Sequence, residues 1–268
     1  MLVVRHNDNP VPRRAGGMSS PSAPDLSGGS NLHVRDSVAF VDGERRHRLA
    51  REVLDGCVSG PDAPVEATAA ALARAESARA VVLVEGISDQ MALETLASRH
   101  GRDLGAEGIV IVPIGGAHAV TRYLVRFGPE GAGLTIVGMC DAGEEHYFRR
   151  GLAAGGFGSS QNRIEMERLG FFVCEEDLED ELIRASGRVA IEALLDSQGD
   201  LGSFQTLRKQ PAWRQEGFEA QMRRWLGAGA RRKLRYSRLL VLSLHLDRMP
   251  RPLKAVLAAT GTPTRQAG

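Results

Sequence analysis

Short apolar runs alternate with segments of helical spacing through the middle of the chain. The apolar runs occupy residues 80–84, 109–113, 134–139 and 171–174. The segments between them that space their apolar residues three and four positions apart, as an amphipathic helix does, are residues 89–100, 119–127 and 145–154. Short, wholly apolar strands that alternate with helices are typical of a parallel sheet with helices on both faces. The pattern therefore predicts an α/β domain.

The sequence on either side of this region has a different pattern. Residues 1–38 are rich in chain breakers, which predicts a disordered leader, and helical spacing begins after them. Beyond residue 176 the pattern predicts helices and no further strand. The expected parts are a leader at 1–38, N-terminal helices at 39–78, the α/β domain at 79–176, a helical C-terminal extension at 177–260 and a disordered tail at 261–268.

Composition limits the partners that the chain as a whole can attract. Lys and Arg total 34 against 33 for Asp and Glu, so the net charge of +1 predicts no global attraction to nucleic acid or to anionic membranes. The cysteines Cys57, Cys140 and Cys174 are widely spaced, which argues against a disulfide framework or a zinc knuckle. The sequence has neither a secretory h-region nor an apolar run of the roughly 18 residues that a membrane span needs. We expect a cytoplasmic protein.

Carboxylates follow two of the predicted strands. Glu85 comes directly after the first strand, Asp89 falls on the first turn of the next helix, and Asp141 comes directly after the third strand. Ligands of parallel α/β sheets bind beyond the carboxyl ends of the strands, so these side chains converge if the two strands are neighbours. Converging carboxylates repel one another unless a hard cation such as Mg²⁺ lies between them. Each one alone could equally be a helix cap or a partner of the helix dipole.

Three segments around these carboxylates resemble the Toprim domain, the metal-binding α/β domain of topoisomerases, bacterial primases and the nucleases of the OLD (overcoming lysogenisation defect) family. The segments are VVLVEGISDQMAL (81–93), IVIVPIGGAHAV (109–120) and LTIVGMCDAGEE (134–145). The resemblance extends over roughly residues 79 to 260 and is greatest to stand-alone Toprim proteins of the OLD type. It implies a Toprim-like, Rossmann-like parallel sheet with helices on both faces, followed by a helical extension.

The resemblance also implies roles for individual carboxylates. Glu85 corresponds to the family's glutamate, a metal ligand or general acid/base, and Asp89 to the acidic residue that helps to hold a second metal. Asp141 corresponds to the first aspartate of the Asp-x-Asp motif and would be catalytic as well as a ligand. The position of the second aspartate is occupied by Gly143.

Two further acidic segments add candidate ligands. Glu144 or Glu145 could reach the cation from a shifted position, although both could instead favour the helix N-terminus. The segment CEEDLEDELI (174–183) contains Asp177 and Glu179, and its Leu-Glu pair matches the element that supplies further metal ligands in OLD-type nucleases. The same acidic run could also be a solvated helix face.

Basic residues near the C-terminus are candidates for contacts to phosphate. Lys209 resembles the lysine that OLD-type nucleases place near the scissile phosphate, where it would stabilise developing charge, although exposed lysines are common. A basic helical stretch that could hold a nucleic-acid backbone contains Arg231, Arg232, Lys233 and Arg235. These arginines could instead pair with the acidic segment.

The leading functional hypothesis is phosphodiester hydrolysis that depends on Mg²⁺ or Mn²⁺, with one or two ions, by a DNA endonuclease or nickase. The substrate would be DNA or another nucleic acid. The sequence has no GxxxxGK[ST] phosphate loop, so any ATP dependence would need an ATPase partner in trans. The first alternative is a catalytically degenerate Toprim module that binds metal or nucleic acid with a regulatory role. The second, a flavodoxin-like or Rossmann-like small-molecule binder, is disfavoured because the glycine fingerprint is missing.

Overall fold

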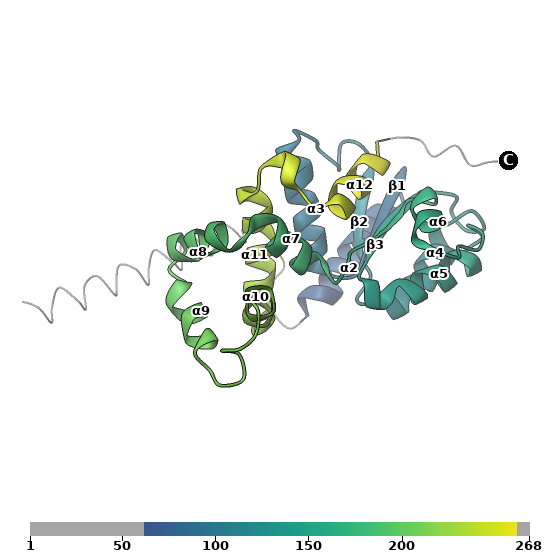
Figure 1. The fold of residues 1–268 in the computed structure, drawn as a ribbon. Coiled ribbons are helices and arrows are strands. Elements are labelled where there is room, and N and C mark those ends of the chain that lie inside the picture. The colour runs from purple at the N-terminus through teal and green to yellow at the C-terminus, as the bar shows by residue number, and fades with distance from the viewer. Residues whose placement is uncertain (1–61, 262–268) are drawn as a thin grey trace, which may run out of the picture. The chain divides into compact units, whose positions relative to one another are not determined.

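The four predicted strands form one parallel sheet. The computed structural model describes residues 62–261 (Figure 1). The strands are β1 (Ala80–Val84), β2 (Ile109–Pro113), β3 (Thr135–Cys140) and β4 (Phe171–Val173). They lie in the order β2-β1-β3-β4, and all three pairings are parallel. The predicted α/β fold is confirmed, and β1 and β3 are neighbours, as convergence of their carboxylates requires.

Helices connect successive strands, as the apolar spacing predicts. β1 and β2 are connected by α3 (Ile87–Arg99), and β2 and β3 by the short 3₁₀ helix η1 (Ala117–Ala119) and α4 (Val120–Phe127). Between β3 and β4 lie η2 (Ala142–Glu144), α5 (Glu145–Ala154) and α6 (Arg163–Arg168). Because parallel strands need crossover connections, this alternation places all the strand-to-helix turns at one edge of the sheet.

The sheet is covered on both faces because every residue of β1 is buried. Successive side chains of a strand point to opposite faces. Val82 and Val84 accordingly join a core that contains side chains of α3, whereas Val81 and Leu83 join a second core with α4, α5 and α2 (Ala63–Ala75). The first core is continuous with the C-terminal helices.

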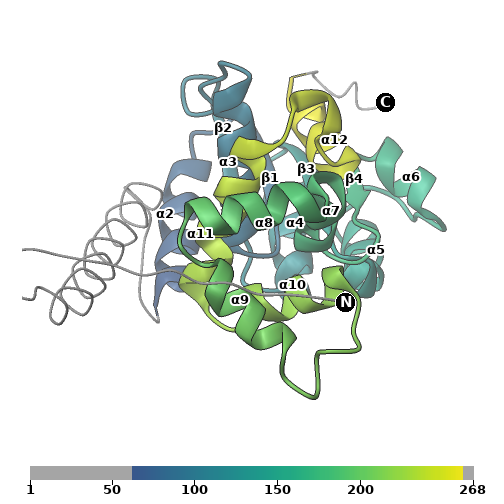
Figure 2. The same ribbon diagram turned by 60° about the vertical axis from the view of Figure 1, so that its left-hand side comes forward.

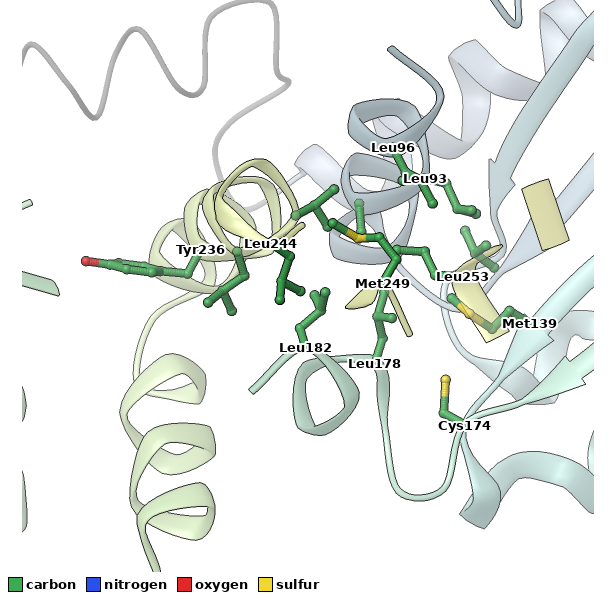
Figure 3. Close-up of a cluster of buried hydrophobic side chains, with 14 of the residues drawn as sticks. Leu93, Leu96, Met139, Cys174, Leu178, Leu182, Tyr236, Leu244, Met249 and Leu253 are labelled. Atoms are coloured by element: carbon green, nitrogen blue, oxygen red, sulfur yellow. The ribbon is translucent and has the colours of Figure 1, made fainter. Parts of the chain in front are cut away.

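The C-terminal region consists of helices that share this first core with the sheet. They are α7 (Leu178–Ser186), α8 (Arg188–Ser197), α9 (Leu201–Arg208), α10 (Phe218–Gly227), α11 (Ala230–Ser243), η3 (Leu246–Arg248) and α12 (Arg251–Ala259). α11 packs along α3, and α12 lies against β3 and β4 (Figure 2). Figure 3 shows Leu93 and Leu96 of α3 in one buried cluster with Leu178 of α7 and Leu253 of α12. Within the described residues the last strand ends before residue 177, and one apolar core continues across that point.

Part of the predicted organisation lies outside the described residues. This is so for the leader at 1–38, for the first part of the N-terminal helices and for all but the first residue of the tail. Within residues 62–261, no helix is long and apolar enough to cross a membrane.

Candidate metal centre

Glu85 and Asp141 meet at the carboxyl edge of the sheet. β1 ends immediately before Glu85, and β3 ends immediately before Asp141. A carboxylate oxygen of Glu85 accepts a hydrogen bond from the backbone amide of Asp141, with a nitrogen-to-oxygen distance of 2.9 Å. The predicted convergence of the two residues is therefore present. The hydrogen bond joins the Glu85 side chain to the backbone of Asp141, so the Asp141 carboxylate takes no part in it.

Asp89 closes the first turn of α3 beside these residues. Its Oδ2 accepts a hydrogen bond from the backbone amide of Gly86 at 2.9 Å, so it caps the helix and still lies within the field of the other carboxylates. Burial and the nearby negative charge of Glu179 raise the pKa of Asp89 to about 7, although the hydrogen bond from the Gly86 amide acts in the opposite direction. Helix capping and participation in a charged site are thus compatible for this residue.

Glu179 reaches the same place from the first turn of α7. The side chain is buried, and its Oε2 lies 3.1 Å from the Nζ of Lys233 on α11. Its Oε1 is buried and has no hydrogen-bond partner among the described residues. Burial raises the pKa of Glu179 despite the neighbouring ammonium group. Burial alone would lower the pKa of Lys233, but the negative charges of Glu179 and Asp89 outweigh it and hold that pKa above its ordinary value.

The carboxylates at this edge destabilise one another's charged forms. Burial, together with the negative charges of Glu85 and Asp89, raises the pKa of Asp141 to about 8. Burial also raises the pKa of Glu85, with a contribution from the charge of Glu144. Such a cluster carries fewer charges at neutral pH than isolated carboxylates would, and a bound cation would restore them.

The structure separates the two candidates for the missing aspartate. Glu145 forms ion pairs with Arg149 at 2.7 Å and with Arg163 at 2.8 Å. Glu144 has a buried Oε2 with no hydrogen-bond partner in the described part of the chain. Glu144, whose charge also acts on Glu85, is therefore the better-placed substitute for the carboxylate absent at Gly143. We refer to Glu85, Asp89, Asp141, Glu144 and Glu179 as the acidic edge.

Asp177 lies next to the acidic edge but has other partners. It is the N-cap of α7, where its Oδ1 accepts a hydrogen bond from the Asp180 amide at 2.7 Å. Its Oδ2 forms an ion pair with Arg223 at 2.8 Å. Its charge still contributes to the raised pKa values of Asp141 and Glu179.

The residues of the acidic edge fit a water-rich divalent cation better than a closed protein cage. No three Asp, Glu, His or Cys side chains of residues 62–261 are arranged as a ready-made metal shell. The donor set is nevertheless made of carboxylate oxygens, and buried oxygens of Glu144 and Glu179 are without partners. Mg²⁺ keeps several of its waters and accepts substrate oxygens, so it needs few protein ligands. The acidic edge meets that requirement.

The two predicted lysines lie in different surroundings. Lys209 lies at the C-terminal end of α9 and is exposed, and within the described residues no side-chain contact joins it to the acidic edge. Lys233, predicted as a nucleic-acid contact, instead lies among the carboxylates through its ion pair with Glu179. Nothing in the linear sequence indicates that Lys233 and Glu179 are in contact. Only the packing of α11 against α7 and α3 brings the ammonium group to the sheet edge.

The predicted basic surface of α11 is largely engaged within the protein. Arg235 is buried, and its guanidinium donates hydrogen bonds to Asp200 and Gln198, so the prediction that it contacts nucleic acid is corrected. Arg232 packs 4.2 Å from the ring centroid of Trp225 and donates to the Trp225 carbonyl oxygen. Arg231 is exposed.

Comparison with known proteins agrees with this fold. The fold and its acidic sheet edge define a Toprim-like α/β domain with a helical C-terminal region. Residues 78–141 match the family model described as overcoming lysogenization defect protein-like, TOPRIM domain, so this segment is similar to an OLD-like Toprim domain. No curated protein matches the chain.

Two solved structures share the wider fold. The C-terminal region of the Xanthomonas campestris pv. campestris OLD protein is 24% identical with a TM-score of 0.53, and the match covers 68% of this chain and 94% of that one. The C-terminal region of the Burkholderia pseudomallei OLD protein is 18% identical with a TM-score of 0.51, and the match covers 68% and 97%. The likeness therefore extends from the Toprim domain into the helical region.

Proposed function

We propose that the acidic edge binds one or two divalent cations, Mg²⁺ or Mn²⁺, and hydrolyses phosphodiester bonds of DNA as an endonuclease or nickase. The observation that carries this proposal is the meeting of Glu85, Asp141 and Glu179 from three elements at one sheet edge, with Lys233 beside them. The OLD-like Toprim match supports the same class of activity.

The carboxylates and the lysine of this site would have different roles, the first in holding a cation and the second in positioning the phosphate. Glu85, Asp89, Asp141 and Glu144 would hold the cation through carboxylate oxygens. When bound, a divalent cation supplies an activated water and stabilises charge on the phosphoryl and leaving oxygens. The Lys233 ammonium group stands where it can attract phosphate to a negatively charged edge and stabilise charge that develops there.

Lys209 remains a weaker candidate for the phosphate-binding lysine. Its exposure and its position at the end of α9 leave it without a contact to the acidic edge in the described structure. Comparing Lys233→Met with Lys209→Met tests the assignment, because only the first should reduce cleavage. If Lys209→Met reduces cleavage and Lys233→Met does not, the original prediction for Lys209 is restored.

Plasmid nicking in Mn²⁺ or Mg²⁺ tests the activity. Glu85→Gln keeps the size of the side chain but removes a ligand charge, and we expect it to reduce nicking by at least about 100-fold. Glu94→Gln is the matched control, because Glu94 is an exposed carboxylate on α3. Equal nicking by the wild type and Glu85→Gln would refute the proposal.

The alternative is a module that binds metal or nucleic acid in a regulatory role and does not cut. The observation that favours it is Gly143, which leaves one family carboxylate absent. Calorimetric titration with Mn²⁺ distinguishes the two, since this alternative predicts Glu85-dependent binding without Glu85-dependent cleavage. An ATPase partner in trans and a cytoplasmic location remain predictions.

A further inference from the structure

Three aromatic side chains meet at the same carboxyl edge of the sheet. His118 belongs to η1 after β2, and His146 and Tyr147 belong to the first turn of α5, which follows Asp141. The Tyr147 ring centroid lies 4.1 Å from that of His118 and 3.8 Å from that of His146. Both histidines are exposed, whereas Tyr147 is half-buried between them. The protein thus presents two imidazole rings to solvent on a tyrosine support.

Two exposed arginines extend this aromatic surface. Arg122 and Arg150 each lie four residues, about one helical turn, beyond one of the histidines. The Arg150 guanidinium carbon lies 5.3 Å from the Tyr147 ring centroid, and Arg122 donates a hydrogen bond to the Tyr123 hydroxyl at 3.0 Å. Within residues 62–261 no carboxylate forms an ion pair with either guanidinium. Both positive charges are therefore open to an external anion.

Close packing of α4 and α5 makes this a single surface. The two helices lie side by side (Figure 1). A Cβ atom at Gly151 of α5 would lie 2.9 Å from the Cδ1 of Leu124 and 3.2 Å from the Cγ1 of Val120, so the absence of a side chain permits the close approach. Tight packing fixes the relative positions of the rings and guanidinium groups. We call His118, Arg122, His146, Tyr147 and Arg150 the α4–α5 face.

The chemistry of the α4–α5 face differs from that of the basic stretch on α11. On α11, Lys233 pairs with Glu179 and Arg235 with Asp200, so these two charges are engaged within the protein. On the α4–α5 face, unpaired guanidinium groups alternate with exposed rings. Rings that stack with bases, together with arginines that contact the intervening phosphates, are the elements of a surface that binds single strands. Bases within a duplex are already stacked and do not offer their faces.

We infer that the α4–α5 face binds single-stranded DNA and leads it to the acidic edge. Bases stack on His118 and His146, and phosphates lie against Arg122 and Arg150. The proximity of His146 and Tyr147 to Asp141 in sequence keeps this surface next to the carboxylates. The inference deepens the proposed function, on which it rests for the reaction, by naming the strand state of the substrate.

Fluorescence anisotropy on the full chain tests this inference directly. The probe is a labelled oligo-dT of about 20 nucleotides, enough for one binding site, and a duplex of the same length is the comparison. EDTA is present so that no strand is cut. The first double variant is His118→Ala with His146→Ala, and the second is Arg122→Gln with Arg150→Gln. The control pair is Arg224→Gln with Arg248→Gln, which removes two exposed arginines from α10 and η3.

The expected results distinguish the contribution of base stacking on the histidines from that of phosphate contacts to the arginines. The wild type binds oligo-dT more tightly than the duplex. The histidine pair weakens binding about tenfold for each base stack lost and leaves the salt dependence unchanged. The Arg122 and Arg150 pair makes the slope of log affinity against log salt shallower by about 1.4, for two single-strand phosphate contacts. The control pair changes affinity less than about twofold. Thermal melting verifies that each variant is folded.

Three outcomes overturn the inference. The first is tighter binding to the duplex than to oligo-dT, and the second is a loss of affinity in the control pair equal to that in the α4–α5 variants. The third is the absence of any effect of the α4–α5 variants on binding. Plasmid nicking with and without Glu85→Gln is measured separately. Glu85-dependent nicking without an effect of the α4–α5 variants on binding refutes only this inference. If the α4–α5 variants weaken binding but nicking does not depend on Glu85, the nuclease proposal is refuted and the single-strand surface is retained.

Discussion

The acidic edge and the group around Asp200 both bury charged side chains, but only the second balances them. Asp200 Oδ2 accepts hydrogen bonds from Arg235 at 3.0 Å and from the Tyr236 hydroxyl at 2.8 Å. A second Arg235 nitrogen donates to Gln198, although its Nε lacks a partner. We call these four residues the Asp200 network. Of the five carboxylates of the acidic edge, only Glu179 forms an ion pair within residues 62–261, and its partner is Lys233.

This difference indicates which buried charged groups stabilise the folded protein. Paired charges that satisfy one another are part of the folded structure, and removal of one partner is costly. Like charges held together raise one another's pKa values and cost stability unless a ligand neutralises them. The acidic edge has the second property, since burial and neighbouring carboxylates raise the pKa of Asp141 to about 8. The comparison predicts opposite effects of substitutions in the two regions.

The largest effect on stability is expected at the Asp200 network. Arg235→Ala leaves the Asp200 carboxylate without its cation, so we expect the free energy of unfolding to fall by about 3–5 kcal/mol. Urea denaturation monitored by tryptophan fluorescence measures the change. Arg231→Ala is the matched control on the same helix, and a substitution of an exposed residue should change stability by less than about 0.5 kcal/mol. Similar losses in the two variants would remove the distinction between paired and exposed arginines on α11.

At the acidic edge the effects on activity and stability should have opposite signs. Asp141→Asn removes a ligand charge and should reduce nicking by at least about 100-fold. The metal-free variant should be no less stable than the wild type at pH 9, because a repelled carboxylate has been replaced by a neutral amide. Chemical denaturation in EDTA measures this stability. A loss as large as that of Arg235→Ala would mean that Asp141 serves the fold.

Local patterns predicted much of the fold. The apolar runs gave the positions of all four strands to within a residue, and Glu145–Ala154 is a helix as expected. The same patterns missed α6 (Arg163–Arg168). α6 has only six residues, too few to show a clear apolar period. Met166 is its one buried residue, and a single buried position defines no helical spacing.

Convergence of the carboxylates was predictable where strand order determines it, as at Glu85 and Asp141. Contacts between distant helices were not predictable. The ion pair of Lys233 with Glu179 and the burial of Arg235 depend on how α11 packs across the sheet-covering helices. The α4–α5 face likewise joins residues from two strand-to-helix turns. No local period in the sequence shows that His118 and Tyr147 are in contact.

Gly143→Asp sharpens the comparison by adding to the acidic edge the carboxylate that it lacks. A Cβ atom at Gly143 would meet no heavy atom within 4 Å, and the position is exposed, so an aspartate fits. We expect Mn²⁺ affinity measured by calorimetry to rise about tenfold, the lower limit for gain of a metal-site interaction. Gly143→Asn is the control with similar shape and no charge. If both variants bind Mn²⁺ equally tightly, Gly143 does not adjoin the cation.

The last predicted effect is a pH dependence of the metal-free protein. The pKa of Asp141 is raised from the ordinary value near 4 to about 8, so the folded state holds a proton that the unfolded state has lost. The stability linked to this group is complete below about pH 4 and is lost as the pH rises through about 8. In EDTA, the melting temperature should therefore fall between about pH 6 and pH 9.

Asp141→Asn should reduce the slope of melting temperature against pH because the amide does not titrate, whereas Glu94→Gln should leave that slope unchanged. Saturating Mg²⁺ should also flatten the dependence, since a bound cation favours the ionised carboxylate. A slope that is the same in Asp141→Asn and in the wild type would show that the acidic edge does not carry the unbalanced charge that distinguishes it from the Asp200 network.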